Sequence, residues 1–443
     1  MRSRSARTSA QPAIATGVLL DEFQRDTFGY FLGETNPANG LVRDSTREGA
    51  PSSIAAVGFA LAAYAAGAER GFISRAEAVK RVLAALRFFW ESPQGREPDA
   101  TGYRGFFYHF LDMETGRRAW ESELSTIDTT FLLAGALAAA TYFDGEAKAE
   151  REIAMLADAL YRRVDWQWAL NGNLTVSHAW KPGRGFSRYR WEGYNEAILL
   201  YVLGLGSPTH PLPEASYRAW TRTYRWKRLY DTEFLYAGPL FIHQLSHVWI
   251  DFRGVRDEYM RSRGIDYFEN SRRATFVQQQ YAIRNPRGFA GYGESCWGLT
   301  ASDGPGPALR RIDGVERRFY DYKARSIPYG PDDGTVAPWA AVASLPFAPE
   351  IVLPAIRHFH EAHPQLRSHY GLLCSFNQTF TDGSRPGQGW HSSGYYGIEQ
   401  GPIVLMIENH RSGFLWSLMK RCPYLITGLR RAGFADGWLS AVG

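Results

Sequence analysis

Apolar residues recur at intervals of three and four along most of this chain, which is the spacing of one face of an α-helix. Residues typical of helix starts accompany the pattern: Pro51 suits a first helical turn, and Ser74 with Glu77 matches a capping box. The pattern predicts about twelve helices, over residues 20–33, 51–67, 74–91, 124–143, 146–164, 193–204, 213–224, 236–248, 256–283, 335–344, 349–361 and 399–420.

The predicted helices are of two chemical kinds. Small apolar residues surround the helix axis almost completely in segments 54–66, 127–141, 196–205 and 335–344. Regular Arg, Lys and Glu residues mark a solvent-facing side in segments 74–91, 146–164 and 256–283. Because an all-round apolar helix is buried and a striped one is peripheral, the alternation predicts an all-α fold, an (α/α)6 toroid with inner and outer helices.

Two stretches alternate like short β-hairpins instead. Residues 106–120 (FFYHFLDMETGRRAW) turn at Glu114-Thr115-Gly116, and residues 176–191 (VSHAWKPGRGFSRYRW) turn at Pro182-Gly183. Both precede a predicted inner helix, so we expect them in loops at one end of the toroid. No Pro, Gly or Ser-rich linker divides the chain, which predicts a flexible tail over residues 1–15 and a single catalytic domain over 16–443.

Composition narrows the function classes. The formal charge is only +5 and no long basic run concentrates it, so nucleic acid is not an expected partner. No run of 18 apolar residues exists, which argues against a membrane span. The three cysteines are widely separated, and the N-terminus makes a poor secretory signal, so we expect a cytoplasmic protein, or a periplasmic one if a leader precedes this start. The oligomeric state is left open.

Aromatic residues are abundant, at 14% of the chain, and crowd into loop-like stretches beside polar groups. Flat apolar faces next to polar side chains suit a sugar, although packing in the core explains most aromatic residues equally well. The signatures of other chemistries are missing or incomplete. No GxSxG motif or phosphate loop occurs, and His243 and His247 lack a third metal ligand at zincin spacing. We therefore expect no cofactor and no metal.

Carboxylates stand where polar loops meet apolar helices. Asp128, Glu196, the pair Asp332 and Asp333, and Glu399 each lie in or near the first turn of such a segment. Free N–H groups and the helix dipole favour an anion there, so simple capping explains any one of them. Helices starting at one end of a toroid would also direct these groups into one cavity, where a protonated and an ionised carboxyl group could hydrolyse a glycosidic bond.

Several sequence blocks together are specific enough to indicate a family. The blocks are GLVRDSTREGAPSSIAAVGFALAAYAAGAERGFISRAEA, STIDTTFLLAGAL, GYNEAILLYVLGLGSPTHP, HVWIDFRG, GESCWGLTASDGPG and GIEQGPIVLMIENHRSG. In this order, over roughly residues 20–435, they resemble the bacterial glycoamylase-like proteins, grouped as glycoside hydrolase family 144. The resemblance implies an (α/α)6 toroid that hydrolyses β-1,2-glucan or sophoro-oligosaccharides with anomeric inversion, releasing sophorose or short oligosaccharides.

The same resemblance suggests catalytic roles. Glu196 matches the family's YNE block, and its apolar setting beside Tyr194 and Trp191 would favour the protonated form of a general acid. Glu399 or Asp128 would activate water, directly or through a relay. Family members often carry Asp at the position of Glu399, and the extra methylene moves the carboxylate by roughly 1.5 Å, which leaves the identity of the base open.

Matching blocks also imply residues that bind glucose units. These are Arg43, Asp44, Tyr194, Trp297, Thr300, Asp303, Asp333 and Trp390. For Trp297, packing in the core is an equal alternative.

Three other functions fit the same residues. A β-1,2-glucan transglycosylase would act with retention, as the related domain of cyclic β-1,2-glucan synthases transfers rather than hydrolyses. In a non-catalytic β-glucan-binding protein, replacing one carboxylate would leave both the binding and the lack of turnover unchanged. A sugar epimerase would need a histidine pair in the pocket, and we interpret His243 and His247 as supporting residues.

Overall fold

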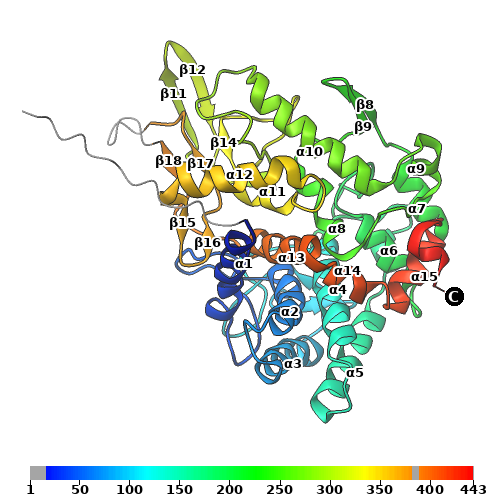
Figure 1. Ribbon diagram of the computed structural model, residues 1–443. Coiled ribbons are helices and arrows are strands. Elements are labelled where there is room, and N and C mark those ends of the chain that lie inside the picture. The colour runs from blue at the N-terminus through cyan, green and yellow to red at the C-terminus, as the bar shows by residue number, and fades with distance from the viewer. Residues whose placement is uncertain (1–15, 382–388, 443) are drawn as a thin grey trace, which may run out of the picture.

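Helices account for most of the secondary structure in the computed structural model, which describes residues 16–381 and 389–442 (Figure 1). The predicted tail, residues 1–15, lies outside the described residues. The α-helices are α1 (Thr16–Gly33), α2 (Ile54–Glu69), α3 (Arg75–Glu91), α4 (Thr126–Tyr142), α5 (Lys148–Arg163), α6 (Ile198–Gly206), α7 (Glu214–Thr221), α8 (Leu245–Trp249), α9 (Glu258–Arg263), α10 (Tyr267–Arg284), α11 (Pro338–Ala343), α12 (Pro349–Ala362), α13 (Gly397–Ser412), α14 (Phe414–Met419) and α15 (Pro423–Arg431).

The strands are short and form small antiparallel sheets among the loops. The largest sheet has the order β2-β3-β5-β6-β7. The strands are β1 (Ser52–Ser53), β2 (Gly102–Tyr103), β3 (Phe106–Tyr108), β4 (Phe110–Leu111), β5 (Leu124–Ser125), β6 (Ala179–Lys181), β7 (Gly185–Phe186), β8 (Trp226–Leu229), β9 (Thr232–Leu235), β10 (Ala301–Ser302), β11 (Ala308–Ile312), β12 (Val315–Phe319), β13 (Lys323–Ala324), β14 (Thr335–Val336), β15 (Arg367–Ser368), β16 (Gly371–Leu372), β17 (Phe376–Asn377) and β18 (Trp390–His391).

The two predicted kinds of helix are confirmed by burial. Helices α2, α4, α6 and α11 are buried on nearly every side, whereas α3 and α5 bury one face. Helix α10, in the third segment predicted to be peripheral, has partly exposed residues between its buried ones. Glycine permits close contact between α2 and α4: a Cβ on Gly58 would lie 2.2 Å from the Phe131 carbonyl oxygen, and one on Gly135 would lie 2.0 Å from that of Gly58. Figure 1 shows α13 between the α1–α2 pair and the α11–α12 pair, and α13 contacts α1, α2 and α11.

Several predicted helix boundaries are wrong for identifiable reasons. The helix predicted over 256–283 ends at Gly264 and restarts at Tyr267, and the helix over 399–420 breaks at Gly413. Both glycines adopt left-handed φ angles, +72° and +66°. Segment 236–248 divides into a 3₁₀ turn (Leu240–His243) and α8. The helix predicted over 335–344 begins at Pro338, after β14, and α15 was not predicted.

Both predicted turns are confirmed. Leu111 pairs with Arg118 across the first turn, and β6 pairs with β7 across the second. The first stretch is not an isolated hairpin, because β3 pairs with β2 and β5 while β4 pairs with β1. These pairings tie the loops to the starts of α2 and α4, since β1 and β5 run directly into those helices. The sequence pattern did not predict the hairpins β8–β9 and β11–β12.

Candidate active site

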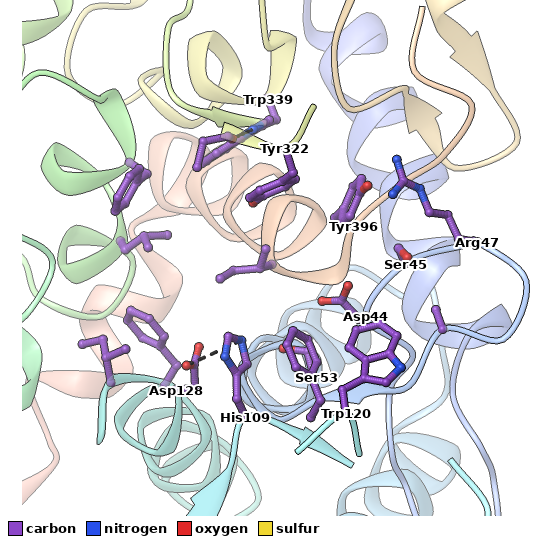
Figure 2. Close-up of a pocket in the computed structure, with 18 of the residues that line it drawn as sticks. Asp44, Ser45, Arg47, Ser53, His109, Trp120, Asp128, Tyr322, Trp339 and Tyr396 are labelled. Carbon is purple, nitrogen blue, oxygen red and sulfur yellow. Dashed lines mark hydrogen bonds and ion pairs between the residues drawn. The ribbon is translucent and has the colours of Figure 1, made fainter. Parts of the chain in front are cut away.

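One cavity of about 620 Å³ is lined by side chains from the starts of the buried helices (Figure 2). Taken in the order α2, α4, α6, α8, α11 and α13, the contributing residues are Ser53, Asp128, Glu196, Leu245, Trp339 and Ile398. Loops add polar and aromatic groups, among them Asp44, Ser45, Arg47, Glu48, His109, Phe110, Trp120, Tyr322 and Tyr396. Of the carboxylates expected at helix starts, Asp128 and Glu196 line this cavity, whereas Asp332, Asp333 and Glu399 do not.

Asp128 is held in the first turn of α4 by its N-cap. The Ser125 hydroxyl accepts a hydrogen bond from the Asp128 backbone N–H at 3.2 Å and donates one to the Asp128 carboxylate at 2.5 Å. The His109 Nε2 atom lies 3.7 Å from the same carboxylate, and His109 Nδ1 lies 2.9 Å from Glu123. Figure 2 shows His109 and Asp128 together on the side of the cavity opposite Tyr322 and Trp339.

His109 carries a positive charge at neutral pH. Burial alone would lower its pKa, but the carboxylates of Asp128 and Glu123 outweigh that effect and raise the pKa to about 9. The hydrogen bond from His109 correspondingly lowers the pKa of Glu123 to about 2. The His109 ring and the N-terminus of α4 therefore both adjoin the Asp128 carboxyl group.

Glu196 has the opposite environment. It occupies the turn just before α6 rather than the helix itself, with its backbone carbonyl accepting a 2.8 Å hydrogen bond from the Ser246 hydroxyl. Burial raises the pKa of Glu196 to about 7, and the negative charge of Asp128 adds to the rise. At neutral pH a large fraction of Glu196 is therefore protonated while its side chain lines the cavity.

Asp44 is a third carboxyl group in the wall. Burial raises its pKa to about 6, with His109 lowering and Asp128 raising the value by charge. Nearby, Arg47 pairs with Asp303 at 2.7 Å and lies over the Tyr396 ring, 5.6 Å from its centroid. Asp303 thus contributes to this wall through Arg47.

Glu399 lies behind the wall. Its neighbour Ile398 lines the cavity, but Glu399 itself is 1% exposed and accepts a hydrogen bond from the Cys374 thiol at 3.1 Å. Within the described part of the chain, its other carboxyl oxygen has no hydrogen-bond partner. Burial raises the pKa of Glu399 well above the ordinary value of a glutamate.

The other expected sugar-binding residues do not line the cavity. Trp297 is fully buried in the core, and Thr300 accepts a hydrogen bond from the backbone of the lining residue Phe241. Arg43 pairs with Glu34 at 3.2 Å, and its backbone carbonyl accepts a hydrogen bond from a buried tyrosine. Thr300 therefore supports the wall from behind, and so does Arg43, which donates a 3.4 Å hydrogen bond to the carbonyl of the lining residue Ala50.

Three more expected residues also have structural partners. Asp333 forms an ion pair with Arg325 at 2.7 Å in which both side chains are fully buried. Tyr194 packs among aromatic rings with its hydroxyl 3.3 Å from His243, and Trp390 lies in β18 opposite Asn377.

Sequence reasoning missed His109, Arg47, Trp120, Tyr322 and Tyr396. The histidine stands in FFYHF, directly before the predicted turn at residues 114–116, so the aromatic loop was the available signal. Trp120 is 66% exposed although it lines the cavity, which makes it an open aromatic face.

A second cavity of about 530 Å³ adjoins the first. The two share His109, Ile127 and Asp128, and the second adds aromatic and basic groups. These include His178, Trp180, Lys181, Arg184 and Trp191. Asp128 therefore lies where the two cavities meet, in a position to face the middle of an extended ligand.

These features define the class of protein: a helical fold whose main pocket gathers carboxyl and aromatic side chains at the starts of its buried helices. In the described ranges, no helix has the length and apolarity to span a membrane. The sequence profile of the Glycoamylase family, described as "Putative glucoamylase", matches residues 188–423. That match covers more than half of the chain, and the chain belongs to this family.

Relatives extend the similarity over nearly the whole chain. It is 30% identical over 450 residues to the exo β-1,2-glucooligosaccharide sophorohydrolase (non-reducing end) of Parabacteroides distasonis. That alignment covers 93% of this chain but 57% of the relative, so the chain spans little more than half of that protein.

Solved structures show the same fold. The endo-β-1,2-glucanase of Chitinophaga pinensis, solved with sophorotriose and glucose, superposes with a TM-score of 0.84 at 27% identity, covering 96% of this chain and 99% of that one. A Bacteroides uniformis protein described as a glucoamylase gives a TM-score of 0.85 at 32% identity, covering 97% and 100%.

Proposed function

We propose that this protein is a glycoside hydrolase that cleaves β-1,2-linked glucan or sophoro-oligosaccharides with inversion at the anomeric carbon. The named activities of the relatives support the substrate class. The observation that carries the proposal is the pairing of two carboxyl groups in one cavity: Glu196, which burial keeps partly protonated, and Asp128, which lies beside the His109 cation. Inverting hydrolysis needs such a pair.

In this proposal Glu196 is the general acid. As the bond between the anomeric carbon and the glycosidic oxygen breaks, the Glu196 proton passes to that departing oxygen. A carboxylate removes a proton from the water that attacks the anomeric carbon from the opposite face, and the product sugar has the inverted configuration. Asp128 is the preferred water-activating group, because it lines the cavity, whereas Glu399 is buried behind the wall and would act only through a relay.

Substrate would bind along the two adjoining cavities. Trp120 and Tyr396 offer aromatic faces for the C–H surfaces of glucose units, and Asp44 offers a carboxyl group for sugar hydroxyls. Trp180 and Trp191 extend the same chemistry into the second cavity. Trp297, Thr300 and the other residues behind the wall would influence binding by holding these groups in place.

We also propose that the buried helices form the inner ring of an (α/α)6 toroid within one catalytic domain. Consecutive inner helices pack together: α2 with α4, α4 with α6, α6 with α8, α11 with α13, and α13 with α2. The remaining neighbours in this ring are α8 and α11. The Gln244 amide at the start of α8 donates a 2.6 Å hydrogen bond to the Ala340 carbonyl of α11 and so connects them. The shared position of their first turns on one cavity supports the same arrangement.

The test is the product profile from linear β-1,2-glucan, with the anomer of the new reducing end followed by proton NMR. Sophorose or short β-1,2-linked oligosaccharides that form with inversion would support the hydrolase. A retained anomer with transfer products would assign a transglycosylase instead. Binding without turnover in both the wild type and Glu196→Gln would assign a glucan-binding protein.

A further inference from the structure

A cysteine and two histidines meet at a place outside the cavity that Asp128 and Glu196 line. Cys296 lies in a loop closed by its bridge to Gly293, His358 lies in α12, and His363 follows the end of that helix. One thiol or ring-nitrogen atom from each residue lies within 4.8 Å of the other two. Cys296 and His363 are 3% and 5% exposed, so these groups converge inside the protein.

The three side chains make few other polar contacts that would account for their grouping. Both ring nitrogens of His363 face the same atom, the Gln378 amide nitrogen, at 3.1 and 3.4 Å. The His358 ring meets the His363 ring edge-on at a centroid distance of 5.2 Å. Among residues 16–381 and 389–442, no hydrogen bond is made by the Cys296 thiol. Three potential ligand atoms are therefore available together.

We propose that Cys296, His358 and His363 bind a divalent transition-metal ion of the zinc type, with a fourth position open to water. One thiolate with two imidazoles is a donor set that favours zinc, and tetrahedral geometry leaves ligand atoms about 3.5 Å apart. The present separations, all within 4.8 Å, exceed that value, so binding requires the three side chains to move closer together. Gln378 adjoins His363 and is positioned to support its ring.

The ion would have a structural role. It would tie the end of α12 to the loop at Cys296, close to sheet β14-β17-β18, because His363 packs on Phe376 of β17 with ring centroids 4.7 Å apart. None of the three ligands lines the sugar cavity. Metal binding is thus expected to change stability and to leave the chemistry of hydrolysis to the carboxylates.

Cobalt substitution tests the site in the full-length protein. Protein freed of metal with a chelator is titrated with Co²⁺, and we expect one cobalt per chain with a sulfur-to-cobalt charge-transfer band, displaced by Zn²⁺. The melting temperature of the protein should rise when the metal binds. Cys296→Ser should lose the band, and His358→Gln should weaken binding at least tenfold. Cys422→Ser is the matched control, because Cys422 is also buried but is outside the cluster.

Clear outcomes would overturn the proposal. These are the absence of a charge-transfer band in the wild type, a band of unchanged intensity in Cys296→Ser, or equal loss in Cys422→Ser. If Cys296→Ser does not fold, as judged by near-ultraviolet circular dichroism, His358→Gln decides the question, since His358 is only partly buried. Unchanged cobalt affinity in a folded His358→Gln protein would reject the assignment.

Discussion

Replacing Glu196 with glutamine separates the catalytic proton from the shape of the side chain. Glutamine is nearly isosteric with the protonated acid but has no proton to give to the leaving oxygen. General acid catalysis contributes about 10²- to 10⁴-fold to rate, so kcat for β-1,2-glucan should fall by that factor. In the wild type, activity should decline as pH rises above about 7, because the protonated form of Glu196 is then lost.

The same substitution has a calculable effect on stability. Raising the pKa of Glu196 from 4.5 in the unfolded chain to about 7 in the fold corresponds to about 3 kcal/mol. Below pH 4.5 the group is protonated in both states and contributes nothing. Between pH 4.5 and 7 only the unfolded chain releases the proton, so the wild type loses stability as pH rises. Glu196→Gln should therefore equal the wild type near pH 4.5 and exceed it by up to about 3 kcal/mol near pH 8.

The assays are reducing-sugar release and urea unfolding, each followed across this pH range. Glu258→Gln is a suitable control, because Glu258 is exposed in the first turn of α9, and neither activity nor the pH dependence of stability should change. Near-wild-type hydrolysis by folded Glu196→Gln would refute the acid assignment. Lost activity without the gain in stability at high pH would refute the argument from burial.

Three further substitutions test other parts of the reasoning. Asp128→Asn should lower kcat about 10²-fold or more and shift the alkaline limb of the residual pH–rate profile to lower pH, because the Asp128 charge raises the pKa of Glu196. Arg325→Met should lower the free energy of unfolding, measured in urea, by about 3–5 kcal/mol, because it leaves the buried Asp333 carboxylate without its cation. Gly58→Ala should lower the melting temperature and the free energy of unfolding by about 1–3 kcal/mol, because its Cβ would overlap the backbone of α4 and force α2 and α4 apart.

Each of these has a control and a contradicting result. Unchanged activity in Asp128→Asn would transfer the water-activating role to Glu399. Arg228→Met removes an exposed ion pair and should cost less than about 1 kcal/mol, so an equal loss in both arginine variants would contradict the burial argument. Gly17→Ala meets no atom within 4 Å, and Gly58→Ala should be clearly less stable than that variant.

The sequence by itself determined the helical class and the burial of the apolar segments, and it named Asp128 and Glu196 among the carboxylates at helix starts. These features depend on local spacing, because a helix that is apolar all round must be buried. Spacing did not determine which of the carboxylates share a cavity: Asp128 and Glu196 do, whereas Glu399 and Asp333 do not. Helix ends were predicted less well, because left-handed glycines such as Gly264 and Gly413 interrupt patterns that otherwise continue.

Only the tertiary structure decided which groups meet. His109 reaches Asp128 through the pairing of β3 with β5, and the exposed Trp120 reaches the cavity from the same loop region. Widely separated segments bring Cys296 to His358 and His363, a grouping that cysteine spacing did not predict. Trp297 and Asp333 resemble binding residues in sequence but are buried, because chain folding rather than residue type sets what a side chain faces.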